Sequence, residues 1–250
     1  ALATLAPFAL VAWLVGRFFV ALVGGANVRR GGVRRVDVGA MKARSPFVAL
    51  VRRESQRFFG SSVYFLNTGF GLAIGLLGAG YLFVVRTLPE EFVAVAGVVG
   101  LSAANLVALA LAAVVSTVDT TAPSVSLEGR RLWIVKGAPL PTSTILDAKT
   151  AFNVLVAAPV ILVVAVAAAI ASRATIPDAA LLLALPLAVN VVVAQLGLIA
   201  NLTWTNLDAP NDTIVVKQSA AVVATLFGGF AVVILTAVAG LAPKDRARIW

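Results

Sequence analysis

The stretch AALLLALPLAVNVVVAQLGLIANL, residues 179–202, carries no charged side chain along its whole length. A helix needs roughly 20 apolar residues to cross a bilayer, and this stretch is long enough. Five other stretches have almost the same character: residues 1–23, 63–85, 92–116, 151–171 and 220–241. The sequence therefore predicts an all-α fold, a polytopic transmembrane bundle with about six spans and short cytoplasmic helices. We expect a multi-pass protein of the cell membrane.

All 11 carboxylates lie between or beyond these apolar stretches. A carboxylate at membrane depth is costly and usually marks an ion or proton path, so the spans lack a proton relay of their own. The chain also has no His and no Cys, which removes the commonest general base and the thiolate ligands of metals. We therefore expect no catalytic residue and no metal site.

Lys and Arg are distributed unevenly over the loops. Nine lie in residues 24–62, four lie in residues 117–150, and Lys217 follows the loop around Asp208, whereas two short loops hold only Arg86 and Arg173. An excess of basic residues places the three larger loops in the cytoplasm. The net charge of +9 is thus a topology signal, and we expect contact with a lipid bilayer and no binding to nucleic acid.

A few amide side chains lie inside the apolar stretches. Such residues line a translocation path in some membrane proteins, but more commonly they bond to a neighbouring helix, and the sequence leaves both interpretations open. The candidate path-lining residues are Asn67, Asn105, Asn153, Asn190 and Gln195.

The loop over residues 117–150 has too ordered a composition for a simple connector. Ser124 or Ser126 can cap a helix that continues to Lys136, where Gly137 and two prolines stop it. Thr144 and Asp147 have capping-box spacing, which predicts that a helix restarts there and leads into the next span. Trp133 is either an anchor for a partner protein or a plain headgroup anchor.

Three segments carry a resemblance to a known family. SLEGRRLWIVKGAPLPTSTILDAK, residues 126–149, resembles the cytoplasmic loop of ABC type-two exporter permeases, in which an acidic residue and Gly precede a basic helix and a Pro-containing turn. RRESQRFFGSSVYFLNTGFG, residues 52–71, and NLDAPNDTIVVKQSAAVV, residues 206–223, resemble one poorly characterised bacterial branch of that family.

The resemblance implies a permease subunit that forms the membrane path of an ATP-driven exporter. It implies one permease domain over residues 1–250, a coupling loop over residues 117–150, and, because this branch often has about twice as many spans, a fragment of a longer permease. A second permease half or copy is then a further expected partner. The residues implied to couple to an ATPase are Glu128, Gly129, Arg130, Arg131, Trp133, Lys136, Pro139 and Lys149. The second implied cytoplasmic contact consists of Asp208, Lys217 and Gln218.

The sequence lacks the phosphate-binding motif G-x-x-x-x-G-K-[ST]. We therefore expect no cofactor in this chain, and ATP, Mg²⁺ and hydrolysis in a separate ATP-binding cassette ATPase subunit. Three other interpretations stay open: a secondary transporter driven by an ion gradient, a membrane-embedded enzyme and a non-transporting membrane scaffold.

Overall fold

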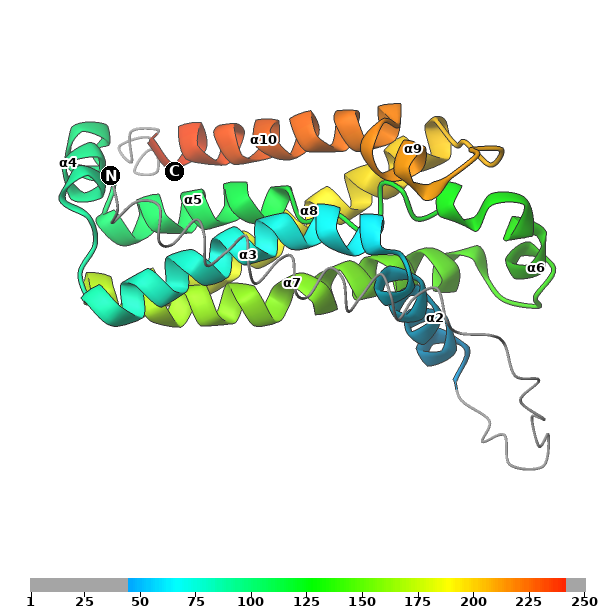
Figure 1. The fold of residues 1–250 in the computed structure, drawn as a ribbon. Coiled ribbons are helices and arrows are strands. Elements are labelled where there is room, and N and C mark those ends of the chain that lie inside the picture. The colour runs from blue at the N-terminus through cyan, green and yellow to red at the C-terminus, as the bar shows by residue number, and fades with distance from the viewer. Residues whose placement is uncertain (1–44, 242–250) are drawn as a thin grey trace, which may run out of the picture. The chain divides into compact units, whose positions relative to one another are not determined.

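A computed structural model describes residues 45–241, which belong to one compact unit. The described residues form helices and turns, with no strand among them (Figure 1). The apolar stretch over residues 1–23 and most of the basic segment over residues 24–62 lie outside the described residues. The all-α prediction is confirmed for the described part of the chain.

Within residues 45–241, four helices are long and apolar enough to cross a membrane. They are α3 (Ser62–Val85), α7 (Thr142–Ser172), α8 (Ile176–Thr203) and α10 (Ala220–Leu241), the last counted together with the short α9 (Asp212–Lys217). Each corresponds to one of the predicted spans, so the number confirmed is four and not six. Helices α3, α8 and α10 begin within three residues of the predicted apolar stretches, whereas α7 begins at Thr142, nine residues before the stretch over residues 151–171.

The predicted span over residues 92–116 is not one straight helix. It is divided into α4 (Glu90–Val99) and α5 (Ala103–Ser116), whose axes differ by 101°, and the pair makes a fifth span only if it is counted as one. Gly100 ends α4 with a φ of 76°, and Ser102 caps α5 by accepting a hydrogen bond from the Asn105 amide. A left-handed glycine followed by a serine cap stops and restarts a helix.

Helix α8 packs against α5, α7 and α10, and α3 packs along α7 (Figure 1). Small side chains such as Ala108, Ala157 and Ala168 are fully buried between these helices, which lets their backbones approach closely. The Gly71–Gly75 pair lies on the buried face of α3, as its spacing predicts: a Cβ added at Gly71 would lie 2.4 Å from Thr117 Oγ1.

Helix α2 (Pro46–Gly60) precedes α3 and packs against the first turns of α7. Phe58 of α2 is buried and makes edge-to-face contacts with Tyr64 and Phe152, at ring-centroid distances of 5.1 and 5.6 Å. Glu54, one turn earlier, is only 3% exposed. An aromatic cluster therefore fixes α2 beside α7 and brings an acidic side chain into the interior.

The loop after α5 differs from the sequence prediction in two places. The predicted helix through Lys136 is divided into a 3₁₀ helix, η2 (Ser126–Arg131), and α6 (Leu132–Lys136), and Gly129, with a φ of 55°, kinks the chain inside η2. Helix α7 begins at Thr142 directly after Pro141, with no side-chain cap, so the predicted capping box at Thr144 and Asp147 is wrong. Proline favours an extended conformation before a helix and needs no cap hydrogen bond.

Candidate functional site

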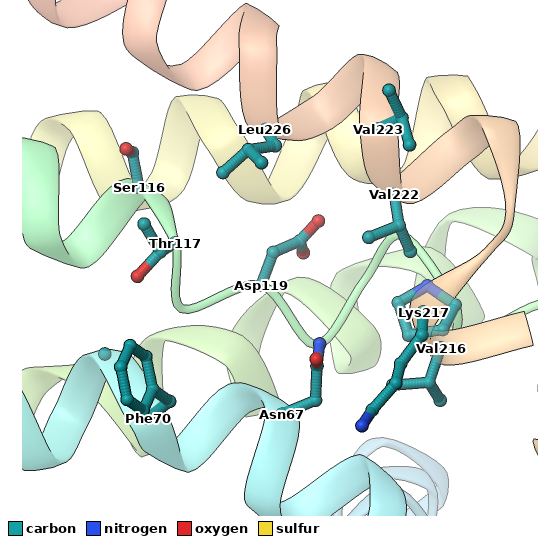
Figure 2. A pocket seen from close by; sticks show the side chains of 12 residues that line it. Asn67, Phe70, Ser116, Thr117, Asp119, Val216, Lys217, Val222, Val223 and Leu226 are labelled. Atoms are coloured by element: carbon teal, nitrogen blue, oxygen red, sulfur yellow. The ribbon is translucent and has the colours of Figure 1, made fainter. Parts of the chain in front are cut away.

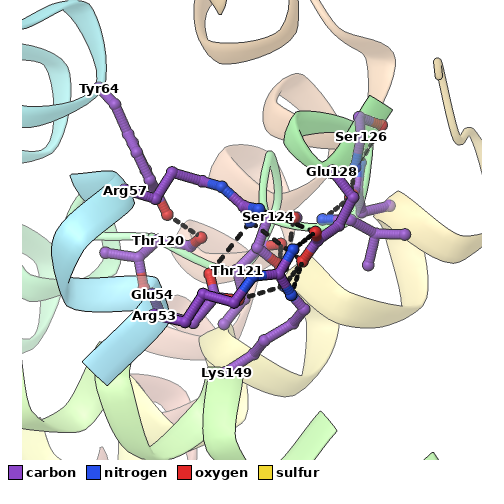
Figure 3. A network of polar contacts seen from close by, with 12 residues as sticks. Arg53, Glu54, Arg57, Tyr64, Thr120, Thr121, Ser124, Ser126, Glu128 and Lys149 are labelled. Atoms are coloured by element: carbon purple, nitrogen blue, oxygen red, sulfur yellow. Dashed lines mark hydrogen bonds and ion pairs between the residues drawn. The ribbon is translucent and has the colours of Figure 1, made fainter. Parts of the chain in front are cut away.

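Five charged side chains from three separate elements meet at one end of the bundle, and we call them the Glu128 cluster (Figure 3). Both Glu128 carboxylate oxygens accept hydrogen bonds from Arg57, at 3.0 and 2.8 Å. Arg53 also donates to both of these oxygens. Two guanidinium groups of α2, one turn apart, thus hold a single carboxylate of η2 in bidentate geometry. The cluster consists of Arg53, Glu54, Arg57, Glu128 and Lys149.

Lys149 of α7 completes the Glu128 cluster. Its Nζ donates to Glu54 Oε1 at 2.7 Å, to Glu128 Oε1 at 3.2 Å and to the Ser124 carbonyl oxygen at 3.2 Å. Glu54, Glu128 and Lys149 are each no more than 4% exposed. All three ammonium protons therefore have a partner, which is the condition under which burying a charged lysine is tolerable.

The electrostatics keep Glu128 ionised. Burial by itself would raise the pKa of Glu128, but hydrogen bonding from Arg57 and the positive charges of Lys149, Arg57 and Arg53 outweigh burial and lower that pKa to about 2. Glu128 is consequently a fixed anion and is unsuited to proton transfer near neutral pH.

Further hydrogen bonds fasten the rest of the loop to the bundle. Asn153 Oδ1 of α7 accepts from the Thr120 amide at 2.7 Å and from the Thr120 hydroxyl at 2.9 Å. Asn201 Oδ1 of α8 accepts from the amides of Val125 and Ser126, at 2.8 and 2.9 Å. Ser126 Oγ accepts from Asn201 Nδ2, so this serine joins the loop to α8 and does not cap a helix. The loop is therefore a rigid extension of α7 and α8.

The outer face of η2 and α6 is exposed and mixed in character. Trp133 is 71% exposed and Ile134 is 53% exposed, while Val135 faces inward and is buried. Arg130 pairs with Asp208 at 3.0 Å on the surface. We call the exposed residues here the α6 surface: Arg130, Arg131, Trp133, Ile134, Lys136 and Pro139. Beneath α6, a pocket of about 590 Å³ lies between Leu132, Ile145 and Leu202.

The structure separates the residues implied to couple to an ATPase into two groups. Arg130, Arg131, Trp133, Lys136 and Pro139 are exposed on the α6 surface. Glu128 and Lys149 are buried in the Glu128 cluster, so neither presents its charge to a partner. Gly129 supplies the left-handed turn between the two groups.

The residues of the second implied cytoplasmic contact, Asp208, Lys217 and Gln218, also lie in two separate places. Asp208 lies beside the α6 surface through its ion pair with Arg130. Lys217, at the end of α9, instead lines a pocket beside α3, and Gln218 is an exposed residue at the end of the same helix. The resemblance thus groups residues that lie at two different places.

The candidate path-lining residues do not converge. Asn153 is a hydrogen-bonding partner of the loop, and Gln195 is exposed and donates to Thr150 Oγ1 at 3.2 Å. Asn190 is fully buried and its side chain has no hydrogen-bond partner among the described residues, and the Asn105 oxygen likewise has none. Asn67 lines the pocket that also contains Lys217.

Sequence reasoning missed the α2 half of the Glu128 cluster. It treated Arg53 and Arg57 only as topology signals and did not single out Glu54. A signal was present: an R-E-x-x-R pattern places both arginines and a glutamate near one another on a helix. Their partners lie 71 to 95 positions away in the chain, and helical spacing alone does not supply such pairs.

Long apolar helices and a fixed ionic cluster at one end of the bundle define the chain as an α-helical protein of the class built to associate with membranes. The chain belongs to the family described as "Putative ATP-binding cassette", whose model matches residues 67–211, more than half of the sequence. No curated protein and no solved structure matches the chain significantly.

The family description corrects three expectations. The chain is matched as an ATP-binding cassette protein and not as a permease, so its interpretation as the permease subunit of a type-two exporter is wrong, in family and in function. The relation to ABC transport systems holds. The description also implies ATP binding in this chain, which overturns the expectation of no cofactor and conflicts with hydrolysis only in a separate subunit.

The described residues do not fit the nucleotide that the family description implies. An ATP-binding cassette holds phosphates on a glycine-rich loop between a strand and a helix, with a lysine and a hydroxyl at fixed spacing. The sequence has no such motif, and residues 45–241 contain no strand on which to build it. The nearest glycine-rich stretch, GFGLAIGLLGAG, lies inside α3 and has no lysine. The described residues therefore offer no cradle for the phosphates of ATP.

Proposed function

We propose that the chain is a multi-pass membrane component of an ATP-binding cassette system, and that the α6 surface is the docking site of an ATPase subunit. The observation that carries this proposal is the Glu128 cluster. Five charged groups hold η2 on α2 and α7, so a force applied at α6 would reach two long helices without being absorbed by the loop. A docking surface that transmits a conformational change needs such a rigid support.

The chemistry of the α6 surface supports a protein partner of a particular kind. An exposed tryptophan and an isoleucine provide an apolar centre, and aromatic and arginine anchors dominate the affinity of protein interfaces. Arg131 and Lys136 add positive charge at the edge, whereas Arg130 is already paired with Asp208. The complementary surface of the partner is therefore apolar in the middle and acidic around it.

The pocket beneath α6 offers a second element of complementarity. Its walls are mostly leucine, isoleucine and valine, and it opens beside the α6 surface. A short apolar segment of the partner can enter such a groove while Trp133 packs against the outer wall. In this arrangement the three larger loops, including the α6 surface, face the cytoplasm of a bacterial cell, which is the side where ATP is available.

Site-specific photocrosslinking tests the docking. A benzoylphenylalanine residue in place of Trp133, in the full chain expressed in its own membrane, is expected to crosslink to a protein that carries a phosphate-binding loop. The same residue in place of Phe227, which is 68% exposed on α10, serves as the control and is expected to label no such protein. If the benzoylphenylalanine at position 133 crosslinks to lipid alone, the proposal is overturned and Trp133 is a headgroup anchor.

The location of the nucleotide is tested separately. Photolabelling of the purified full chain with azido-ATP, with and without excess ATP, shows whether this chain binds the nucleotide itself. If the proposal is right, azido-ATP labels the crosslinked partner, and excess ATP prevents this labelling. Competed labelling on this chain in the absence of any partner would place the nucleotide here and contradict a separate ATPase.

A further inference from the structure

A second polar site lies away from the Glu128 cluster and the α6 surface. A pocket of about 480 Å³ opens between α3, the segment that follows α5, and the α9–α10 region (Figure 2). Phe70, Val222 and Leu226 form apolar walls, and Asn67, Asp119 and Lys217 contribute polar groups. None of these residues belongs to the Glu128 cluster or to the α6 surface.

Asp119 lies half-buried in this pocket with one oxygen available. Asp119 Oδ1 accepts from the Thr121 amide and hydroxyl, both at 2.7 Å, and from the Ala122 amide at 3.2 Å. Asp119 Oδ2 has a single long contact, 3.2 Å from the same Ala122 amide. No Lys or Arg of the described chain forms an ion pair with it. A half-buried carboxylate without a counter-charge is costly unless a cation approaches it.

The carboxylate is held in this orientation. Thr121 Oγ1 also lies 2.7 Å from the Ala194 carbonyl oxygen of α8, which fixes the turn against that helix. The turn approaches Gly197 so closely that a Cβ there would lie 2.3 Å from Thr121 Oγ1 and 2.7 Å from Asp119 Oδ2. Figure 2 shows the Asp119 carboxyl group pointing away from α3 and towards Leu226 and Val222 of α10.

The hydroxyl groups around Asp119 present acceptors and not donors. The Thr117 hydroxyl donates to the Val114 carbonyl oxygen at 2.7 Å, and the Ser116 hydroxyl donates to the Ala113 carbonyl oxygen at 2.7 Å. Each hydroxyl has one proton, so only its lone pairs remain for a ligand. These hydroxyl groups therefore cannot donate to Asp119, and Asp119 Oδ2 remains the acceptor of the pocket that has only one long hydrogen bond.

Lys217 is the positive group of the same pocket, but it does not form an ion pair with Asp119. It is exposed at the end of α9, where water solvates its ammonium group, and Figure 2 shows Asn67 between it and Asp119. A solvated ammonium needs no counter-ion, whereas a half-buried carboxylate does. The site therefore favours a cation at Asp119 over an anion at Lys217.

We propose that this pocket binds a small amphiphile that carries a primary ammonium group. The ammonium group bonds to Asp119 Oδ2. The apolar part lies against Phe70 and Leu226. The proposal does not depend on the docking of an ATPase, because it uses other residues and a different part of the bundle.

Thiol protection tests the site, since the chain contains no cysteine. Val223→Cys places one thiol on the pocket wall, and Val84→Cys, at a position that is 83% exposed on α3 and outside the pocket, provides the control. Octylammonium at about ten times its dissociation constant is expected to slow maleimide labelling of Val223→Cys roughly tenfold, by mass action. Labelling of Val84→Cys stays unchanged, and 1-octanol, of equal apolar length, protects weakly.

Variants separate the two charges of the pocket. Adding Asp119→Asn to Val223→Cys is expected to abolish protection by octylammonium. Lys217→Gln keeps or increases protection, because a like charge is removed. Each of three results would overturn the proposal. Octyl sulfate could protect the thiol in a way that requires Lys217, octanol could protect it as well as octylammonium does, or Asp119→Asn could leave protection unchanged.

Discussion

Arg57 and Glu128 form a bidentate ion pair across 71 positions of sequence, with both guanidinium nitrogens within 3.0 Å of the carboxylate. The pair joins α2 to η2, and Lys149 joins both to α7. Because the three elements share one set of charges, removing one partner leaves a buried carboxylate with fewer positive charges around it. The stability of this end of the bundle therefore rests on the completeness of the Glu128 cluster.

Lys149→Met tests that statement. The substitution keeps much of the side-chain volume but leaves Glu54 without its 2.7 Å partner, and breaking a buried pair on one side costs about 3–5 kcal/mol. We expect a loss of this size in SDS-induced unfolding of the purified protein. Arg130→Ala, which breaks the exposed pair with Asp208, is the matched control and should cost less than about 1 kcal/mol. Equal losses in the two variants would contradict the difference in burial.

The pKa of Asp119 predicts a pH-dependent stability. Burial raises this pKa from 3.8 to about 6, against the opposing hydrogen bonds from Thr121 and Ala122. Between these values the folded carboxyl group binds a proton more tightly than the unfolded one, so stability falls as pH rises from about 4 to 6 and stays lower above it. Asp119→Asn should therefore be more stable than the wild type at pH 8, by on the order of 2 kcal/mol.

That advantage should vanish below about pH 3, where Asp119 is protonated in both states. Thermal unfolding of both proteins across this pH range measures the difference. Glu128 has the opposite dependence, because its lowered pKa gives stability that is lost only as pH falls from about 4.5 towards 2, and it affects both proteins alike. A constant difference between the two proteins from pH 4 to pH 8 would show that Asp119 does not titrate there.

Gly197→Ala tests the close approach of the Asp119 turn to α8. The new Cβ would lie 2.3 Å from Thr121 Oγ1 and 2.9 Å from the Ala122 amide nitrogen, so the turn must move, at a cost of about 1–3 kcal/mol. Gly78→Ala in α3 has nothing within 4 Å of its added Cβ and should be neutral or slightly stabilising. Unfolding in detergent compares the two variants, and similar effects would indicate that the turn is free to shift.

The proposed orientation can be tested with single cysteines. Asn211→Cys lies in a loop expected to face the cytoplasm, and Ile176→Cys lies at the opposite end of α8, where Ile176 is 88% exposed. A membrane-impermeant maleimide should label Ile176→Cys and not Asn211→Cys in intact cells, and both after lysis. The reverse pattern would invert the topology and move the α6 surface away from cytoplasmic ATP.

Trp133→Ala is expected to weaken capture of the ATPase by at least about 2 kcal/mol, the usual cost of removing an aromatic anchor. Stability should not change, because the side chain is 71% exposed. Co-purification at several partner concentrations measures the loss, with Phe227→Ala as the control for an exposed aromatic on α10. Unchanged capture in Trp133→Ala would leave the docking surface elsewhere.

Long apolar runs made α3, α7, α8 and α10 predictable, because a span of that length without charge has few alternatives to a helix. The break between α4 and α5 was missed although Gly100 and Ser102 are visible in the sequence: their uncharged neighbours gave the whole stretch the composition of one span. Gly129 was likewise predicted inside a continuous helix, whereas its positive φ kinks the chain inside η2, before α6 begins at Leu132.

The candidate site was predictable only in part. Trp133 and its basic neighbours are exposed, as a docking segment requires. The burial of Glu128 and Lys149 could not be foreseen, because it depends on Arg53, Glu54 and Arg57 arriving from a distant helix. Asp119 was treated as one more loop carboxylate, since nothing local in the sequence shows that the turn after α5 folds back against Gly197.

The order of elements in the Glu128 cluster also determines how the protein must be assembled during synthesis. Helix α2 leaves the ribosome before the other two elements and carries Arg53, Glu54 and Arg57 of the cluster. Glu128 follows, and Lys149 is made last. Until α7 emerges, Glu128 can pair with the arginines, but Glu54 has no lysine to neutralise it. The nascent chain therefore holds an incomplete ionic site while α3 and α5 are synthesised, and the arrival of a single lysine near the start of α7 completes it.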